Sequence, residues 1–265
     1  MRRSAMAALS WLALPGQCGV GGDAFALLRR PDGTVAAFGG SGFGPDGGEP
    51  AFYRWPSRTA SRAAATAATT GAGCSSMVVV DAEGRAVSLI HSLAFAFGAR
   101  ITVPGTGIVL NDRLGRGAYL IDGHPNEVRP RRRPLHTLNA WLVTGGIGGG
   151  LLHVGNTPGG DGQVQWNAQL LSHLLDHGHD PAVAVGAPRF TVHPDSDADV
   201  LGGPPELRVE ARLGASRIAA LRSAGHAVAV QDAWGAGGSA QVVSVADGAL
   251  LGAADPRQDG VALGV

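Results

Sequence analysis

The stretch Gly71–Gly98, GAGCSSMVVVDAEGRAVSLIHSLAFAFG, decides how the chain folds. Small residues lead to Cys74, an apolar run covers 77–80, a turn covers 81–84, and a second strand-like run covers 86–90. Two such runs joined by a short polar turn predict a β-hairpin. The first residue of this hairpin carries a thiol, which is a potential nucleophile.

The segments on both sides of the hairpin alternate between strand-like and helix-like patterns. Hairpins interleaved with helices at this chain length predict an antiparallel α+β fold with layered packing. We expect helices over 4–14, 165–176, 181–186 and 214–224, a tight glycine-rich loop over 157–162, and strands over 24–29, 34–38, 151–156, 206–209, 227–231, 240–246 and 249–253.

The chain has 265 residues, enough for one large domain with a real core. Residues 46–73 contain an Ala/Thr-rich run without a strong apolar face, which is typical of a linker. We therefore expect a single domain over 1–265, in which this linker joins an N-terminal hairpin unit over 1–45 to a core over 74–265.

Composition and charge exclude several classes of function. The chain is 45% hydrophobic and 16% charged with no net charge, so neither a polyanion partner nor a disordered chain is indicated. All 21 basic residues are Arg, which excludes Lys as a Schiff base or general base. No run is long enough to span a membrane, and no CxxC pattern indicates structural zinc. We expect no cofactor, no metal, no nucleic acid and no membrane partner.

The N-terminus over 1–18 imitates a secretory signal, because two Arg precede an apolar run. The run is short, and no clean small-x-small cleavage site precedes the next motif. We therefore favour a domain helix and a cytoplasmic location, with secretion left open. The cysteines at 18 and 74 do not make a disulfide framework.

Three other features have a structural and a functional interpretation. His173, His177 and His179 favour a solvated helix end over a metal site. The Arg run over 129–133 favours a solvated loop, with anion binding as the alternative. The glycines over 19–22 lack the spacing and the Lys of a phosphate loop, so a tight turn before a hairpin is preferred.

Several separated stretches together resemble the gamma-glutamyltransferase family, closest to its divergent, non-glutamyl branch. The resemblance implies an N-terminal-nucleophile hydrolase, a four-layer αββα sandwich in which two antiparallel sheets stack between helical layers. The stretches are CGVGGDAFAL from 18, the Cys74 hairpin, PGTGIVLNDRLGRG from 104, GHPNEVRPRRRPLHTLN from 123, NTPGGDGQVQWN from 156, APRF from 187 and AADPR from 253.

In that family the precursor cleaves itself before a Thr, which becomes the nucleophile with its own α-amine as base. The matching residue here is Cys74, so the resemblance implies cleavage between Gly73 and Cys74. A thiol is a better nucleophile than a hydroxyl near neutral pH, and an α-amine with a pKa of about 8 can accept its proton. The alternative is a small buried Cys at a strand start.

The resemblance also implies the rest of a catalytic site. Ser92 matches a hydroxyl residue that hydrogen-bonds the nucleophile, and Gly159 and Gly160 match a pair whose N–H groups form an oxyanion hole. It further implies five pocket neighbours, which are Asn111, His136, Thr137, Asp161 and Gln163.

The sequence departs from the classical family where a γ-glutamyl group is held. Gly115-Arg116 replaces a pair of acids, and roughly 35 residues stand where the family has a long lobe with a carboxylate-binding Arg. Arg116 or the run over 129–133 is then a candidate to meet a substrate carboxylate.

We expect an amide hydrolase or acyltransferase for a small-molecule amide that is not a classical γ-glutamyl peptide. We also expect association of the two cleaved fragments, or a homodimer. The alternative is a non-catalytic, partner-binding subunit.

Overall fold

The computed structural model describes residues 26–29, 35–38, 51–54, 62–67, 74–95, 97–115, 120–146, 148–193, 204–258 and 260–264. The strands are β1 (Ala26–Arg29), β2 (Val35–Phe38), β3 (Ala51–Arg54), β4 (Arg62–Ala67), β5 (Cys74–Asp81), β6 (Ala86–Ser92), β7 (Ala140–Thr144), β8 (Leu151–Asn156), β9 (Phe190–His193), β10 (Glu206–Glu210), β11 (Val228–Gln231), β12 (Gln241–Ala246), β13 (Ala249–Ala254) and β14 (Gly260–Gly264). The helices are α1 (Gln163–Leu175), α2 (Pro181–Gly186) and α3 (Ala215–Ser223), with 3-10 turns η1 (Gly160–Gly162) and η3 (Ala211–Leu213).

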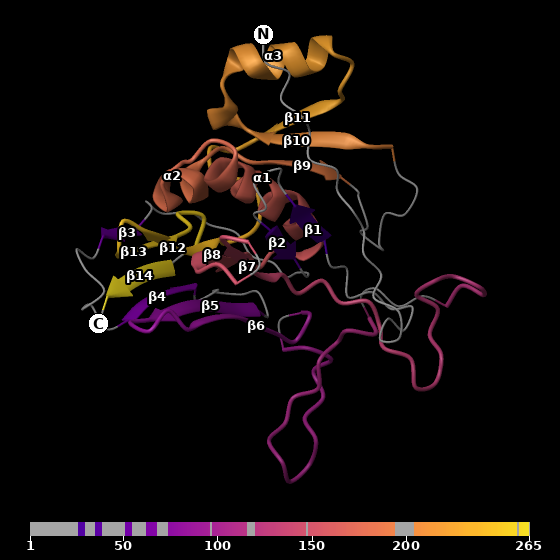
Figure 1. Ribbon diagram of the computed structural model, residues 1–265. Helices are drawn as coiled ribbons and strands as arrows, with labels where there is room; N and C mark the ends of the chain where they lie inside the picture. Colours follow the sequence, from indigo (N-terminus) through magenta and orange to yellow (C-terminus); the bar gives the residue numbers. More distant parts are fainter. Residues whose placement is uncertain are drawn as a thin grey trace.

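Two sheets stack at the centre of the molecule (Figure 1). The larger has the order β1-β2-β7-β8-β12-β13-β3, and the smaller has the order β14-β4-β5-β6. Helices α1 and α2 cover the outer face of the larger sheet, whereas no helix among the described residues lies over the outer face of the smaller one (Figure 1). A third sheet, β11-β10-β9, lies beyond α1 and carries α3. No described helix is both long and apolar enough to cross a membrane.

The β5–β6 hairpin has the strict alternation that a sheet with one buried face requires. Along β5, Cys74, Ser76, Val78 and Val80 are buried and the residues between them are more exposed. The turn is closed by Asp81, whose carboxylate accepts bonds from the backbone N–H groups of residues 83 and 85. The predicted hairpin is therefore confirmed, and the local turn chemistry sets its register.

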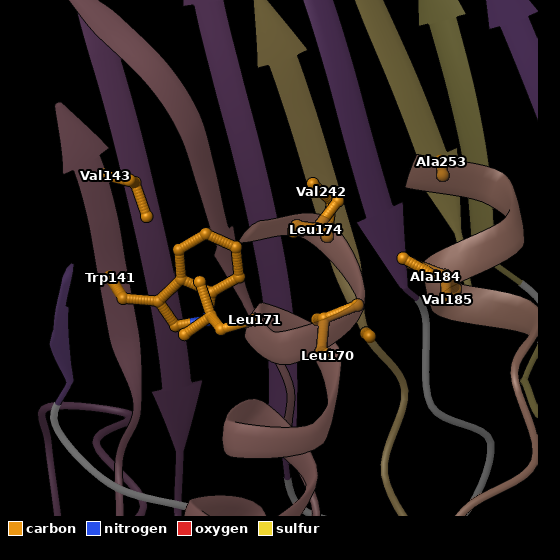
Figure 2. Packing of buried hydrophobic residues seen from close by; sticks show 10 residues of the cluster. Trp141, Val143, Leu170, Leu171, Leu174, Ala184, Val185, Val242 and Ala253 are labelled. Carbon is orange, nitrogen blue, oxygen red and sulfur yellow. The ribbon is translucent and has the colours of Figure 1, made fainter. Parts of the chain in front are cut away.

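Apolar packing joins the layers. Between the sheets, Val78 and Val80 meet aliphatic side chains of β8, β12 and β13. On the other side, α1 packs on the larger sheet beside Trp141, and α2 packs on the same sheet near Ala253 (Figure 2). Each large apolar side chain buried in this way stabilises the fold by about 1.5–3 kcal/mol. The outer cluster consists of Trp141, Val143, Leu170, Leu171, Leu174, Ala184, Val185, Ala240, Val242 and Ala253.

Several predictions can be compared directly with the described elements. The strand over 151–156 and the helix over 181–186 have the predicted bounds, and α1, α3, β10–β13 and the first hairpin lie within about two residues of theirs. The expected linker over 46–73 contains strands β3 and β4. Neither these two strands nor β7, β9 and β14 were among the predicted strands. The helix over 4–14 lies outside the described residues, and the three-part division of the chain stays a prediction.

Strand β4 shows why its pattern was missed. Its sequence, RAAATA, has neither alternation nor large apolar residues. It is a strand because it pairs antiparallel with β5 on one side and β14 on the other. Long-range pairing of this kind overrides weak local propensity.

A buried ion network joins the third sheet to the larger one. Glu210, at the end of β10, accepts two bonds of 2.7 Å from the guanidinium of Arg257, which follows β13. Asp255 pairs with Arg257 at 3.0 Å and with Arg189 at 2.5 Å. Burial by itself would raise the pKa of Asp255, but attraction by Arg189 and Arg257 outweighs it and lowers the pKa. The APRF and AADPR stretches supply three members of this network.

We predict that Arg257→Met destabilises the protein by about 3–5 kcal/mol, because it removes a buried guanidinium that pairs with both Glu210 and Asp255 and leaves each buried carboxylate with one cation fewer. Glu206→Gln is the matched control, since it breaks a half-exposed pair with Arg208 and should cost no more than about 1 kcal/mol. Urea unfolding measures both. Equal losses in the two variants would contradict the structural role of the network.

Candidate active site

The thiol of Cys74 and the hydroxyl of Ser92 lie together across the β5–β6 hairpin. The two residues are register partners, and Sγ lies 2.9 Å from Oγ. Ser92 Oγ also accepts a bond of 2.9 Å from the backbone N–H of Ala94. Because that N–H already uses one lone pair of Ser92 Oγ, the hydroxyl hydrogen can point at sulfur. A hydrogen bond donated to sulfur favours the thiolate, which is the nucleophilic form.

Gly159 and Gly160 form a tight loop before α1. Their φ values are 147° and 66°, which residues with a Cβ rarely adopt. The indole of Trp166 occupies the space where a Cβ on Gly159 would lie. It also occupies the space where a Cβ on Gly238, in the neighbouring loop, would lie. Trp166 Nε1 donates to Thr191 Oγ1 at 2.7 Å, which fixes the ring. The glycine loop therefore packs closely against Trp166, a residue that the sequence did not identify as part of the site.

Strand β8 connects this loop to the hairpin. It ends at Asn156, directly before the loop, and its last residues bond to both strands of the hairpin. Asn156 Nδ2 donates to Met77 O at 3.1 Å, and Ser88 Oγ donates to Gly155 O at 2.8 Å. The predicted nucleophile and the predicted oxyanion donors thus sit on two segments that are bonded to each other.

Two of the predicted pocket neighbours, Asn111 and Thr137, are both bonded to Arg113. The backbone N–H of Arg113 donates to Asn111 Oδ1 at 3.0 Å, and its guanidinium donates to Thr137 Oγ1 at 3.1 Å. Asp112 N–H donates to Leu93 O at 2.9 Å, so this segment adjoins the residue after Ser92. Sequence reasoning missed Arg113, although it stands within the quoted NDR motif.

The remaining predicted site residues lie in different settings. His136 Nδ1 accepts a bond from the backbone N–H of Leu138 at 3.2 Å. Gln163 is the first residue of α1 and is fully buried. Arg116 and the side chain of Asp161 lie outside the described residues.

The two surface clusters that the sequence left open have local partners. Arg129 pairs with Glu127 at 2.5 Å on an exposed loop, and Arg132 donates to Glu127 O at 3.5 Å. His173 and His179 face each other with Nδ1 atoms 3.1 Å apart. Among the residues that the structure describes, no group of three or more His, Cys, Asp or Glu is arranged to hold a metal ion.

Comparison with known proteins identifies the family. The Gamma-glutamyltranspeptidase family model matches residues 53–265. The chain belongs to the gamma-glutamyltranspeptidase family. It is 37% identical over 189 residues to the Glutathione hydrolase-like YwrD proenzyme of Bacillus subtilis, and 35% identical over 196 residues to the Oxamate amidohydrolase proenzyme of Klebsiella pneumoniae. Each match covers 71% of this chain and 35% of the relative, so the chain spans about a third of the length of these relatives.

Solved structures of gamma-glutamyltranspeptidases and acylases support the same assignment. Cephalosporin acylase from Bacillus halodurans superposes with a TM-score of 0.60 at 27% identity, covering 71% of this chain and 33% of its own. Gamma-glutamyltranspeptidase from Pseudomonas nitroreducens superposes with a TM-score of 0.59 at 28% identity, covering 71% of this chain and 97% of the matched chain. The predicted α+β fold of the N-terminal-nucleophile hydrolase type is confirmed.

We predict that Gly159→Ala lowers the free energy of unfolding by about 2–5 kcal/mol, because a Cβ there is both strained and opposed by the Trp166 ring. Gly178→Ala is the matched control. Its φ is also positive, but no atom lies within 4 Å of the added Cβ, so the cost should be about 1–2 kcal/mol. Chemical denaturation compares the two, and equal costs would contradict the role of Trp166.

We predict that acidification weakens the fold through His173. Burial lowers the pKa of His173, and repulsion by His179 and His177 lowers it further. The folded state then binds fewer protons than the unfolded state, so this contribution to stability is complete above about pH 6.5 and is lost as pH falls through the lowered pKa. His173→Gln should flatten the dependence of the urea midpoint between about pH 7.5 and about pH 5. An unchanged slope would contradict this assignment.

Proposed function

We propose that the chain is an N-terminal-nucleophile amidohydrolase or acyltransferase in which Cys74 forms the acyl-enzyme. The observation that carries the proposal is the 2.9 Å contact between Cys74 Sγ and Ser92 Oγ at the first residue of β5. Cys74 is also the residue that the sequence resemblance aligns with a self-released nucleophile.

The nucleophile is released by cleavage of the chain itself. The thiol of Cys74 attacks the carbonyl carbon of Gly73, and the peptide nitrogen leaves as the α-amine of Cys74. Water then hydrolyses the resulting thioester, which returns the thiol and leaves Gly73 as a carboxylate. The free α-amine, with a pKa of about 8, becomes the general base for later turnovers.

The catalytic cycle uses the same atoms. The α-amine takes the proton of the Cys74 thiol, and the thiolate attacks the amide carbonyl of the substrate. The N–H groups of Gly159 and Gly160 stabilise the oxyanion that forms, and the α-ammonium returns the proton to the leaving amine. Water resolves the thioester in hydrolysis, and an acceptor amine resolves it in acyl transfer.

The two fragments should remain associated after cleavage. Strand β4 precedes Gly73, yet it pairs with β5 and β14, both of which follow it. Strand β2 pairs with β7, and β3 pairs with β13. After cleavage, the N-terminal fragment therefore still supplies paired strands to both sheets.

The substrate is proposed to be a small-molecule amide other than a classical γ-glutamyl peptide. Gly115-Arg116 offers a cation where the classical site has acids, which suits a carboxylate on the substrate. Relatives named as an oxamate amidohydrolase and as acylases suggest that this framework accepts amides of different acids.

The second candidate is a non-catalytic subunit that binds a partner chain. It is favoured by the exposed outer face of the smaller sheet, where Met77, Val87 and Leu89 are 39–55% exposed. Aliphatic patches of this kind are typical of surfaces that another polypeptide covers. An unaltered rate of acylation after Cys74→Ala would favour this candidate.

We predict that p-nitrophenyl acetate acetylates the parent protein at Cys74, as located by peptide mapping. Cys74→Ala should abolish the adduct, and Ser92→Ala should slow its formation by about 10²-fold because the thiolate loses its donor. Ser75→Ala is the matched control, since Ser75 is exposed on the opposite face of β5. An adduct elsewhere, or none in the parent, would contradict the proposal.

A further inference from the structure

Asn156 makes an unusual set of contacts between the sheets. Its side chain is fully buried. Its amide nitrogen donates to Ser88 Oγ at 2.9 Å and to Met77 O at 3.1 Å, and it lies 3.4 Å from Leu89 O. One side chain of the larger sheet thus reaches both strands of the hairpin that carries Cys74.

These contacts form a closed arrangement. Met77 and Leu89 are register partners, so Asn156 meets the hairpin at one rung of its ladder. Ser88 accepts the bond from Asn156 and donates its own hydroxyl to Gly155 O at 2.8 Å. Gly155 and Asn156 of β8 are therefore both bonded to the hydroxyl of Ser88 on β6. These two bonds resist sliding of β8 along β6 as well as separation of the two strands.

The position of this arrangement links the two halves of the site. The Cys74–Ser92 rung lies three residues along the hairpin from the Met77–Leu89 rung. Asn156 is also the last residue of β8, and the loop with Gly159 follows three residues later. Asn156 is therefore three residues from Gly159, and its contact Met77 is three residues from Cys74.

The two sheets also meet through apolar packing, which does not fix their relative position. Val78 and Val80 of β5 pack on Val154 and Val243, and such packing is non-directional. Hydrogen bonds weaken steeply when their geometry changes. A misplacement of about 1 Å between reacting groups costs about 10²-fold in rate. The hydrogen bonds of Asn156 and Ser88 are therefore suited to hold β8 at a fixed position relative to the hairpin.

We propose that Asn156, acting through Ser88 and the hairpin backbone, is a positioning residue that sets the distance between the Cys74 thiol and the N–H groups of Gly159 and Gly160. This inference rests on the proposed function. It requires a donor at position 156, because three acceptor oxygens surround the amide nitrogen. A carboxylate at this position would face the same oxygens without a hydrogen to donate.

The test compares two reactions of one thiol. Acetylation by p-nitrophenyl acetate passes through an oxyanion and needs the glycine loop, whereas alkylation by iodoacetamide is a direct displacement at carbon that needs the thiolate alone. Asn156→Asp and Asn156→Leu should slow acetylation by about 10²-fold and leave the alkylation rate of Cys74 unchanged. An unchanged ratio of the two rates in folded variants would overturn the proposal.

The controls separate positioning from general damage. Asn167 is also fully buried, but its Oδ1 accepts from Trp141 Nε1 at 2.8 Å, so Asn167→Asp keeps the acceptor. Asn167→Asp should lower the melting temperature and leave the ratio of the two rates unchanged. If the variants at position 156 do not fold, Ser88→Ala removes the bridging hydroxyl alone and should lower the ratio in the same direction. A parent-like ratio in Ser88→Ala would then overturn the proposal.

A last readout does not depend on catalysis. If the parent is not acetylated at all, the proposed function fails, and hydrogen exchange then tests the positioning. Ser88→Ala, or a folded variant at position 156, should exchange the backbone amides of β5 and β6 faster than the parent. Exchange as slow as in the parent would show that Asn156 and Ser88 do not hold the hairpin.

Discussion

The antiparallel register that pairs Cys74 with Ser92 is the constraint on which the site depends. Because side chains alternate between the faces of a strand, a slip of one residue would turn the thiol to the outer face of the sheet. The Asp81 turn sets this register at one end, and the valines of β5 bury the inner face. Asn156 and Ser88 then bond the hairpin to β8. The turn, the apolar packing and the hydrogen bonds to β8 therefore all favour the same register of the hairpin.

The fold also separates the groups that we propose to react from those that we propose to select the substrate. The thiol, the Ser92 hydroxyl and the glycine loop stand on strands of the two central sheets or directly after them. The segment with Asn111 and Arg113 lies on a connection that leaves the sheets after β6 (Figure 1). Rigid strands suit bond-making groups and loops suit substrate selection, so the chemistry follows from this fold more directly than the substrate does.

Sequence alone predicted what local pattern determines. The hairpin, α1 and the closing strands followed from periodicity, and the resemblance located Cys74 and Ser92, which the structure brings into contact. The sequence pattern could not predict β4, because its alanine-rich segment forms a strand only by pairing with β5 and β14. It could not predict Trp166 under the glycine loop or Asn156 between the sheets either. These roles arise from contacts between residues far apart in the chain, which no local pattern records.

Catalysis with an α-amine as the base requires that Cys74 becomes the N-terminal residue of a new chain. Intact-mass measurement of the purified protein, with N-terminal sequencing of each species, tests it most directly. We expect one fragment that ends at Gly73 and a second that begins at Cys74, with the two co-purifying. We also expect that Cys74→Ala stays as one chain. An intact parent chain, or cleavage at another bond, would contradict it.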